Sequence, residues 1–124
     1  MLFLSVTIVL TDCSPSQQAI NYSINAEGII EAQPDTMVKD AIRLKGKVLN
    51  NGKTMSDRLQ YQFEVIDVVK RGATFSTLEP EIGEKVMLIT TQEVKFKKGN
   101  EVILDATTSE KKEDGVLWIN MIIE

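Results

Sequence analysis

Ile42-Arg43-Leu44-Lys45-Gly46-Lys47-Val48 decides the fold, because core-forming and charged residues alternate along the whole stretch. Such a two-residue period places one face of a strand in a core and the other in water. The glycine of this stretch, Gly46, takes one of the inward positions. The stretch therefore predicts a half-buried antiparallel strand that is wet on one side.

The same period continues toward the C-terminus. Leu59, Tyr61, Phe63 and Val65 alternate with polar residues, and from Ile66 the apolar residues change parity. A change of parity within one strand is expected either where a β-bulge re-aims the strand or where the strand becomes buried on both sides. Further alternating or apolar stretches predict strands over residues 85–91, 102–106 and 116–123, with turns at residues 50–53, 99–100 and 113–115.

Residues 37–124 show no convincing helical period with helix caps, so we predict an all-β domain there. Five or six strands of this length predict a small antiparallel barrel, and an immunoglobulin-like sandwich is the alternative fold. Tyr61 shares its parity with Leu59 and Phe63, which predicts a place in the core. Trp118 shares its parity with Val116 and is expected in the core or at its rim.

The first strand resembles that of an OB-fold barrel, in which a glycine lets the strand bend between two sheets. Residues 61–72, 82–90 and 96–106 add glycine and apolar positions similar to the netrin-like, tissue-inhibitor-of-metalloproteinase kind of OB barrel. The chain lacks the cysteines that staple most of those domains. The resemblance therefore implies the barrel and does not imply protease inhibition.

The amino-acid composition narrows the classes of function that the chain can have. The 124 residues have a net charge of −4, which disfavours a general affinity for nucleic acid. With no histidine and one cysteine, the chain offers no Cys-His or Ser-His pair for catalysis and lacks the commonest metal ligand. The carboxylate pairs Glu79/Glu81 and Glu113/Asp114 fall in an expected loop and turn. We predict a protein that is not an enzyme and has no metal and no cofactor.

The start of the chain is signal-like. Residues 1–10 are almost wholly apolar and precede Leu10-Thr11-Asp12-Cys13, which resembles a bacterial lipobox. Asp12 stands where the lipobox has Gly, Ala or Ser, and no Lys or Arg precedes Lys39. The resemblance implies a leader over residues 1–13, lipid attachment at Cys13, export, and membrane anchorage in the cell envelope.

The residues after the cysteine are polar and carry Pro15, so residues 14–36 are expected to form a tether that includes an edge strand near residues 20–26. The alternative is a cytoplasmic protein in which residues 2–10, rich in β-branched side chains, form a buried strand.

The fold analogy places a ligand on the wet face of the second and third barrel strands and in the loop after the first strand. The candidate ligand-binding residues there are Lys47, Asn51, Lys53 and Arg58. The first functional hypothesis is a lipoprotein whose barrel binds a protein or a small ligand. The alternatives are a soluble OB module for single-stranded nucleic acid and a structural subunit of an envelope complex.

Overall fold

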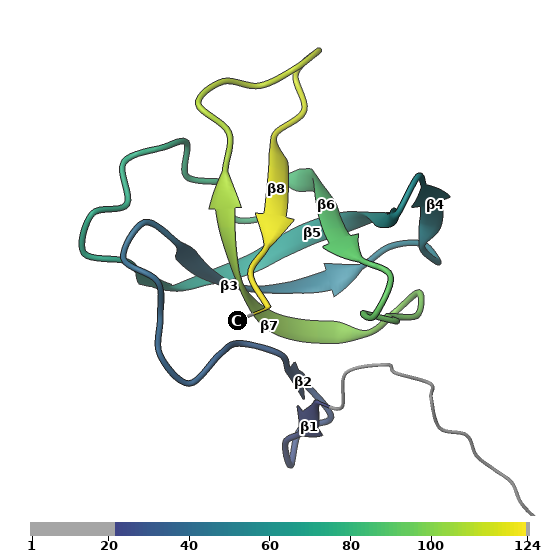
Figure 1. Ribbon diagram of the computed structural model, residues 1–124. Helices are drawn as coiled ribbons and strands as arrows, with labels where there is room; N and C mark the ends of the chain where they lie inside the picture. Colours follow the sequence, from purple (N-terminus) through teal and green to yellow (C-terminus); the bar gives the residue numbers. More distant parts are fainter. Residues whose placement is uncertain (1–21, 124) are drawn as a thin grey trace, which may run out of the picture.

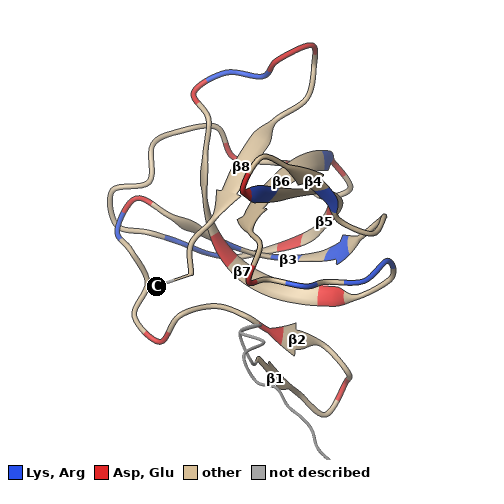
Figure 2. Ribbon diagram, turned by 45° about the vertical axis from the view of Figure 1, so that its right-hand side comes forward, with Lys and Arg blue, Asp and Glu red and all other residues tan. Residues whose placement is uncertain are grey.

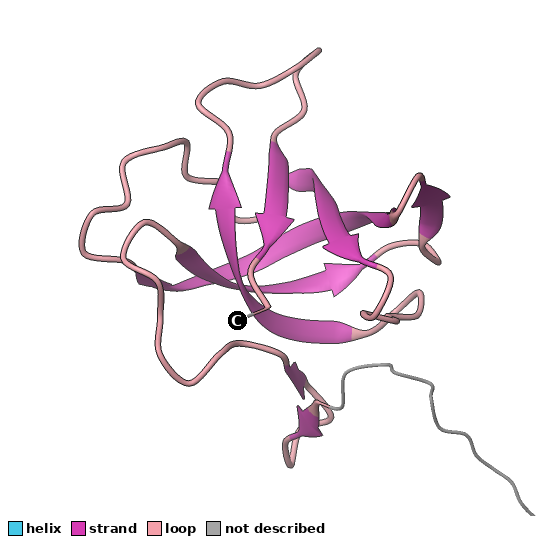
Figure 3. Cartoon of the chain, in the orientation of Figure 1, coloured by secondary structure: helices cyan, strands magenta, loops and turns pink. Residues whose placement is uncertain are grey.

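The computed structural model describes residues 22–123, and strands are its only regular elements (Figures 1 and 3). No helix long and apolar enough to cross a membrane occurs in this range. In chain order the strands are β1 (Ser23–Ile24), β2 (Ile30–Glu31), β3 (Ile42–Val48), β4 (Lys53–Met55), β5 (Arg58–Arg71), β6 (Lys85–Thr91), β7 (Glu101–Thr108) and β8 (Trp118–Met121).

Five of these strands close into a barrel. β3 pairs with β5, β5 with β6, β6 with β8, β8 with β7, and β7 again with β3. The predicted all-β class and five-stranded barrel are confirmed, and the order is consistent with an OB-like barrel. Because the sheet closes on itself, the alternative of a two-sheet sandwich is wrong.

One pairing differs from the expected antiparallel barrel. β6 and β8 are parallel, whereas the other four pairings that close the barrel are antiparallel. The reason is the course of β7, which lies between them in the chain. β7 runs back across the barrel to pair with β3, and β8 then returns in the direction of β6 (Figure 1).

The predicted bulge in the long strand β5 is confirmed. Gly46 pairs with Val65 and Lys45 pairs with Asp67, so Ile66 has no partner on β3, and a second shift leaves out Val69. Gly46 is needed for close packing: a Cβ there would lie 2.3 Å from Cζ of Phe63. The bulges and the glycine let β3 and β5 curve around the core.

The turns follow the sequence signals only in part. Asp114 and Gly115 have φ angles of 53° and 79°, as the predicted turn requires. The turn expected at residues 50–53 is wrong. The hairpin between β4 and β5 turns at residues 56–57, where Ser56 has φ 54°. Gly52 instead makes room for Tyr61, whose Cζ would lie 2.8 Å from a Cβ.

The barrel interior is apolar, and Tyr61 lies in it as predicted, 1% exposed. Its hydroxyl donates a hydrogen bond to the carbonyl oxygen of Val94 at 3.3 Å and accepts one from the amide of Phe96 at 3.0 Å. Both hydrogen bonds fix the segment between β6 and β7 against the core. This segment closes one end of the barrel without a helix.

The N-terminal part of the described chain packs on the barrel. β1 and β2 form an antiparallel pair, and β2 adds in parallel to β7 (Figure 1). Ile29 and Ala32 are buried, so the described part of the expected tether is folded against β7. Residues 1–21 lie outside the described residues, and with them Cys13, the leader and the alternative strand over residues 2–10.

Candidate functional site

The outer surface of β5, β6 and β8 carries two rows of side chains, defined by the strand register. One row runs Gln62, Met87, Trp118, and the other runs Gln60, Ile89, Asn120. We call these six residues the amide–tryptophan face. Directly paired residues point to the same side of a sheet, so each row sets an apolar side chain beside amides or an indole.

The face is shallow and partly preorganised. Gln62 and Asn120 are exposed, and the other four side chains are half-buried. Nε2 of Gln60 lies 2.9 Å from Sδ of Met87, which holds that amide over the apolar strip. Strands lie about 4.8 Å apart and alternate residues about 7 Å apart, so the face measures about 10 by 7 Å. That area matches one or two sugar rings.

Charged side chains border the face and leave its centre uncharged. On one side lie Arg58, two positions before Gln60 on β5, and Lys53, which pairs with Gln60 from β4. On the other side Glu64 pairs with both Lys47 and Lys85. The central surface therefore presents amide dipoles and apolar atoms without a net charge.

The four candidate ligand-binding residues from the sequence fall in different places. Lys53 and Arg58 are exposed at the border of the face, and Lys47 lies on β3 between Glu64 and Glu101. Asn51 has a local structural contact, because its Oδ1 accepts a hydrogen bond from the amide of Lys98 at 3.1 Å. The structure thus brings two of the four to one surface and separates the other two.

The residues of the face itself were not predicted. Trp118 lies on the outer surface, half-buried, while its neighbours Leu117 and Ile119 face the core and are fully buried. A signal was present in the sequence, since residues 85–91 and 116–123 carry apolar side chains at both parities. Such strands bury one face in the core and offer a second apolar face elsewhere.

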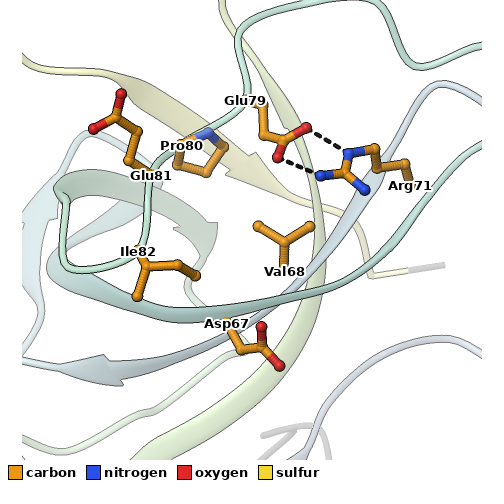
Figure 4. A pocket seen from close by; sticks show the side chains of 7 residues that line it. All are labelled: Asp67, Val68, Arg71, Glu79, Pro80, Glu81 and Ile82. Carbon is orange, nitrogen blue, oxygen red and sulfur yellow. Dashed lines mark hydrogen bonds and ion pairs between the residues drawn. The ribbon is translucent and has the colours of Figure 1, made fainter.

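A second hollow, of about 470 Å³, lies between the end of β5 and the loop over residues 72–84 (Figure 4). Both oxygens of Glu79 accept hydrogen bonds from Arg71 across it. These bonds lower the pKa of the Glu79 carboxyl and raise the pKa of Arg71. The guanidinium and the carboxylate satisfy each other's hydrogen bonds. This ion pair fastens the loop to β5.

The described residues hold no group of three or more His, Cys, Asp or Glu side chains that could bind a metal ion. The two carboxylate pairs noted in the sequence lie in a loop and in a turn of the described range. Glu79 pairs with Arg71, and the amide of Glu81 donates to Oε1 of Glu84 at 2.9 Å. Asp114 occupies the turn before β8.

Comparison with known proteins leaves the function to be argued from this geometry: no family model matches the chain, and no curated protein matches it.

Proposed function

We propose that this chain is a non-enzymatic binding protein whose amide–tryptophan face binds a neutral oligosaccharide. The observation that supports the proposal is the uncharged centre of that face, in which Trp118, Met87 and Ile89 lie among three amides. An indole can pack on the C–H surface of a sugar ring, while amides donate to and accept from its hydroxyls. Both interactions work without charge on the ligand.

Two other classes of ligand fit this face less well. Single-stranded nucleic acid requires a positive groove together with several aromatic platforms, whereas this centre is uncharged and holds one aromatic ring. A stable protein partner covers about 800 Å² on each side, far more than the face offers. The OB-like barrel is consistent with a ligand on its second and third strands, by analogy of fold.

The chain contains one tryptophan, so its fluorescence reports directly from the face. We expect the emission of Trp118 to change when the protein is titrated with one or more members of a panel of neutral di- and trisaccharides of glucose, galactose, mannose and N-acetylglucosamine. Gln62→Ala should weaken that binding about tenfold, through a lost hydrogen bond that leaves a sugar hydroxyl unpaired.

The matched control is Gln92→Ala, which removes an exposed amide outside the two rows, one that donates to the carbonyl oxygen of Ser56 at 3.1 Å, and should leave binding unchanged. The proposal is contradicted if no saccharide changes the emission. It is equally contradicted if a thymidine oligonucleotide is the ligand that does so, or if both amide variants weaken binding alike.

We further propose that the protein is a lipoprotein of the cell envelope, held at a membrane through Cys13. Support comes from the apolar residues 1–10 and the lipobox-like residues 10–13. We also propose that the barrel is of the netrin-like kind. This proposal does not include protease inhibition.

Mass spectrometry of the protein from the membrane fraction of the cells that produce it should find a chain that begins at Cys13 and carries acyl groups. Cys13→Ser should yield an unacylated chain that keeps residues 1–12. A native chain that keeps residues 1–12 and carries no acyl group would exclude the anchor.

A further inference from the structure

The segment between β6 and β7, residues 92–100, presents three lysines on a fixed backbone. Val94 and Phe96 are buried, whereas Lys95, Lys97 and Lys98 are exposed. We call this segment the lysine loop. Within residues 22–123 none of the three lysines forms an ion pair.

Hydrogen bonds hold the loop at both sides. Tyr61 fixes its first half through Val94 and Phe96, as described above. In its second half, Oδ1 of Asn100 accepts from the amide of Lys97 at 2.8 Å, and the amide of Gly99 donates to the carbonyl oxygen of Val48 at 2.7 Å. The loop also meets the β3–β4 connection, because the amide of Lys98 donates a hydrogen bond to Oδ1 of Asn51. The backbone that carries the three lysines is therefore already ordered. Binding through these lysines would cost little further backbone entropy.

Charge is unevenly distributed over the molecule. Residues 47–58 and 92–101, which meet at this end of the barrel, carry six basic and three acidic side chains, although the whole chain has a net charge of −4. Figure 2 shows blue segments along the lysine loop and at the tip of β3. This end is therefore positive on a molecule that is otherwise acidic.

The described chain begins at the same end. The ring of Tyr22 packs against that of Phe96, with centroids 6.0 Å apart, so the first described residue lies against the lysine loop. Tyr22 stands nine positions after Cys13 in the chain. At about 3.5 Å per residue, even a fully extended segment spans only about 30 Å. A lipid on Cys13 would keep the lysine loop within that distance of the bilayer.

We propose that the lysine loop docks on the anionic headgroups of the membrane that holds the protein. The proposed anchor at Cys13 supplies the orientation, so the inference rests on that part of the proposed function. The charge of the loop supplies the attraction. Basic side chains that are held close to an anionic membrane surface are attracted to its headgroups, and this attraction falls off within a Debye length.

The test uses the full chain carrying Cys13→Ser, so that no lipid contributes. We expect it to co-sediment at low salt with vesicles of equal parts phosphatidylcholine and phosphatidylglycerol, and to stay in solution with phosphatidylcholine alone. Replacing Lys95, Lys97 and Lys98 by Gln together should weaken the binding on the order of 100-fold, since each basic residue near an anionic surface contributes about one factor of five.

The matched control replaces Lys39, Lys70 and Lys111 by Gln, which removes three exposed lysines elsewhere and changes the net charge equally. Its binding should stay within about twofold of the parent chain. Equal losses in both triple variants would overturn the inference, because they would reflect net charge alone. So would absence of binding to the anionic vesicles, or retention by a thymidine oligonucleotide with no retention by vesicles.

These outcomes are separate from those of the proposed function. Acylation of Cys13 is read by mass, and saccharide binding is read by Trp118 emission, which neither triple variant removes.

Discussion

Arg43→Met is expected to lower the free energy of unfolding by about 3 to 5 kcal/mol, because it leaves a buried carboxylate without its cation. Asp105 is 0% exposed, and its oxygens accept hydrogen bonds from Nε and Nη2 of Arg43 at 2.7 and 3.1 Å. The same Nη2 donates to the carbonyl oxygen of Pro34 at 3.2 Å. The pair therefore joins β3, β7 and the chain that leads into the barrel.

The double variant Arg43→Met/Asp105→Leu distinguishes the cost of an orphaned charge from the loss of packing. Replacing both members of a buried pair by apolar side chains is often close to neutral. We expect the double variant to recover at least half of the stability that Arg43→Met loses, as measured by urea denaturation. A single variant that loses less than about 1 kcal/mol would show that the pair is solvated.

Gly46→Ala is expected to destabilise the protein by about 3 kcal/mol, at the upper end for an inserted methyl group. The added Cβ would lie 2.3 Å from Cζ of Phe63 and 2.6 Å from the carbonyl oxygen of Glu64. The first contact is with a buried ring that has little room to move, and the second is with the backbone of β5. Denaturation with urea measures the change.

A second substitution tests the cause. Phe63→Leu removes the ring that the new methyl group meets, so the cost of Gly46→Ala should be smaller in that background than in the parent chain. Some cost should persist, since the contact with Glu64 involves backbone. Strictly additive losses would show that the ring is not the obstacle, and would contradict this packing of β3 on β5.

The barrel strands could be predicted because each buries one side, which imposes a two-residue period on the sequence. The bulge was predictable for the same reason: Ile66 changes the parity of β5. The period says nothing about which strands pair over long distances. The parallel pairings β2–β7 and β6–β8 were therefore not foreseen.

Single residues were harder to predict where one type serves two purposes. Asn51-Gly52 is a strong turn signal, yet Gly52 gives room to Tyr61 and Asn51 binds the lysine loop. The actual turn uses Ser56, which adopts a positive φ despite its side chain. Local sequence could not show this, because the competing contacts come from residues distant in the chain.

The residues predicted from the sequence lie only at the border of the candidate site. Lys53 and Arg58 were predicted because the fold analogy places a ligand in the loop after the first strand, and both lie at the edge of the amide–tryptophan face. The centre of the face depends on which side of β6 and β8 points outward. Both strands are apolar on both sides, so only the register with β5 decides that Met87, Ile89 and Trp118 are outside.

The most direct test of the account is an amide-resolved NMR titration of the full chain with the saccharide that binds best in the fluorescence panel. We expect the largest chemical-shift changes at the backbone of Gln60, Gln62, Met87 and Ile89 and at the indole N–H of Trp118. The loop over residues 72–84 should stay unchanged. Shift changes concentrated around Ile82 and Glu79, with the β5–β6–β8 surface unaffected, would contradict the proposed binding face.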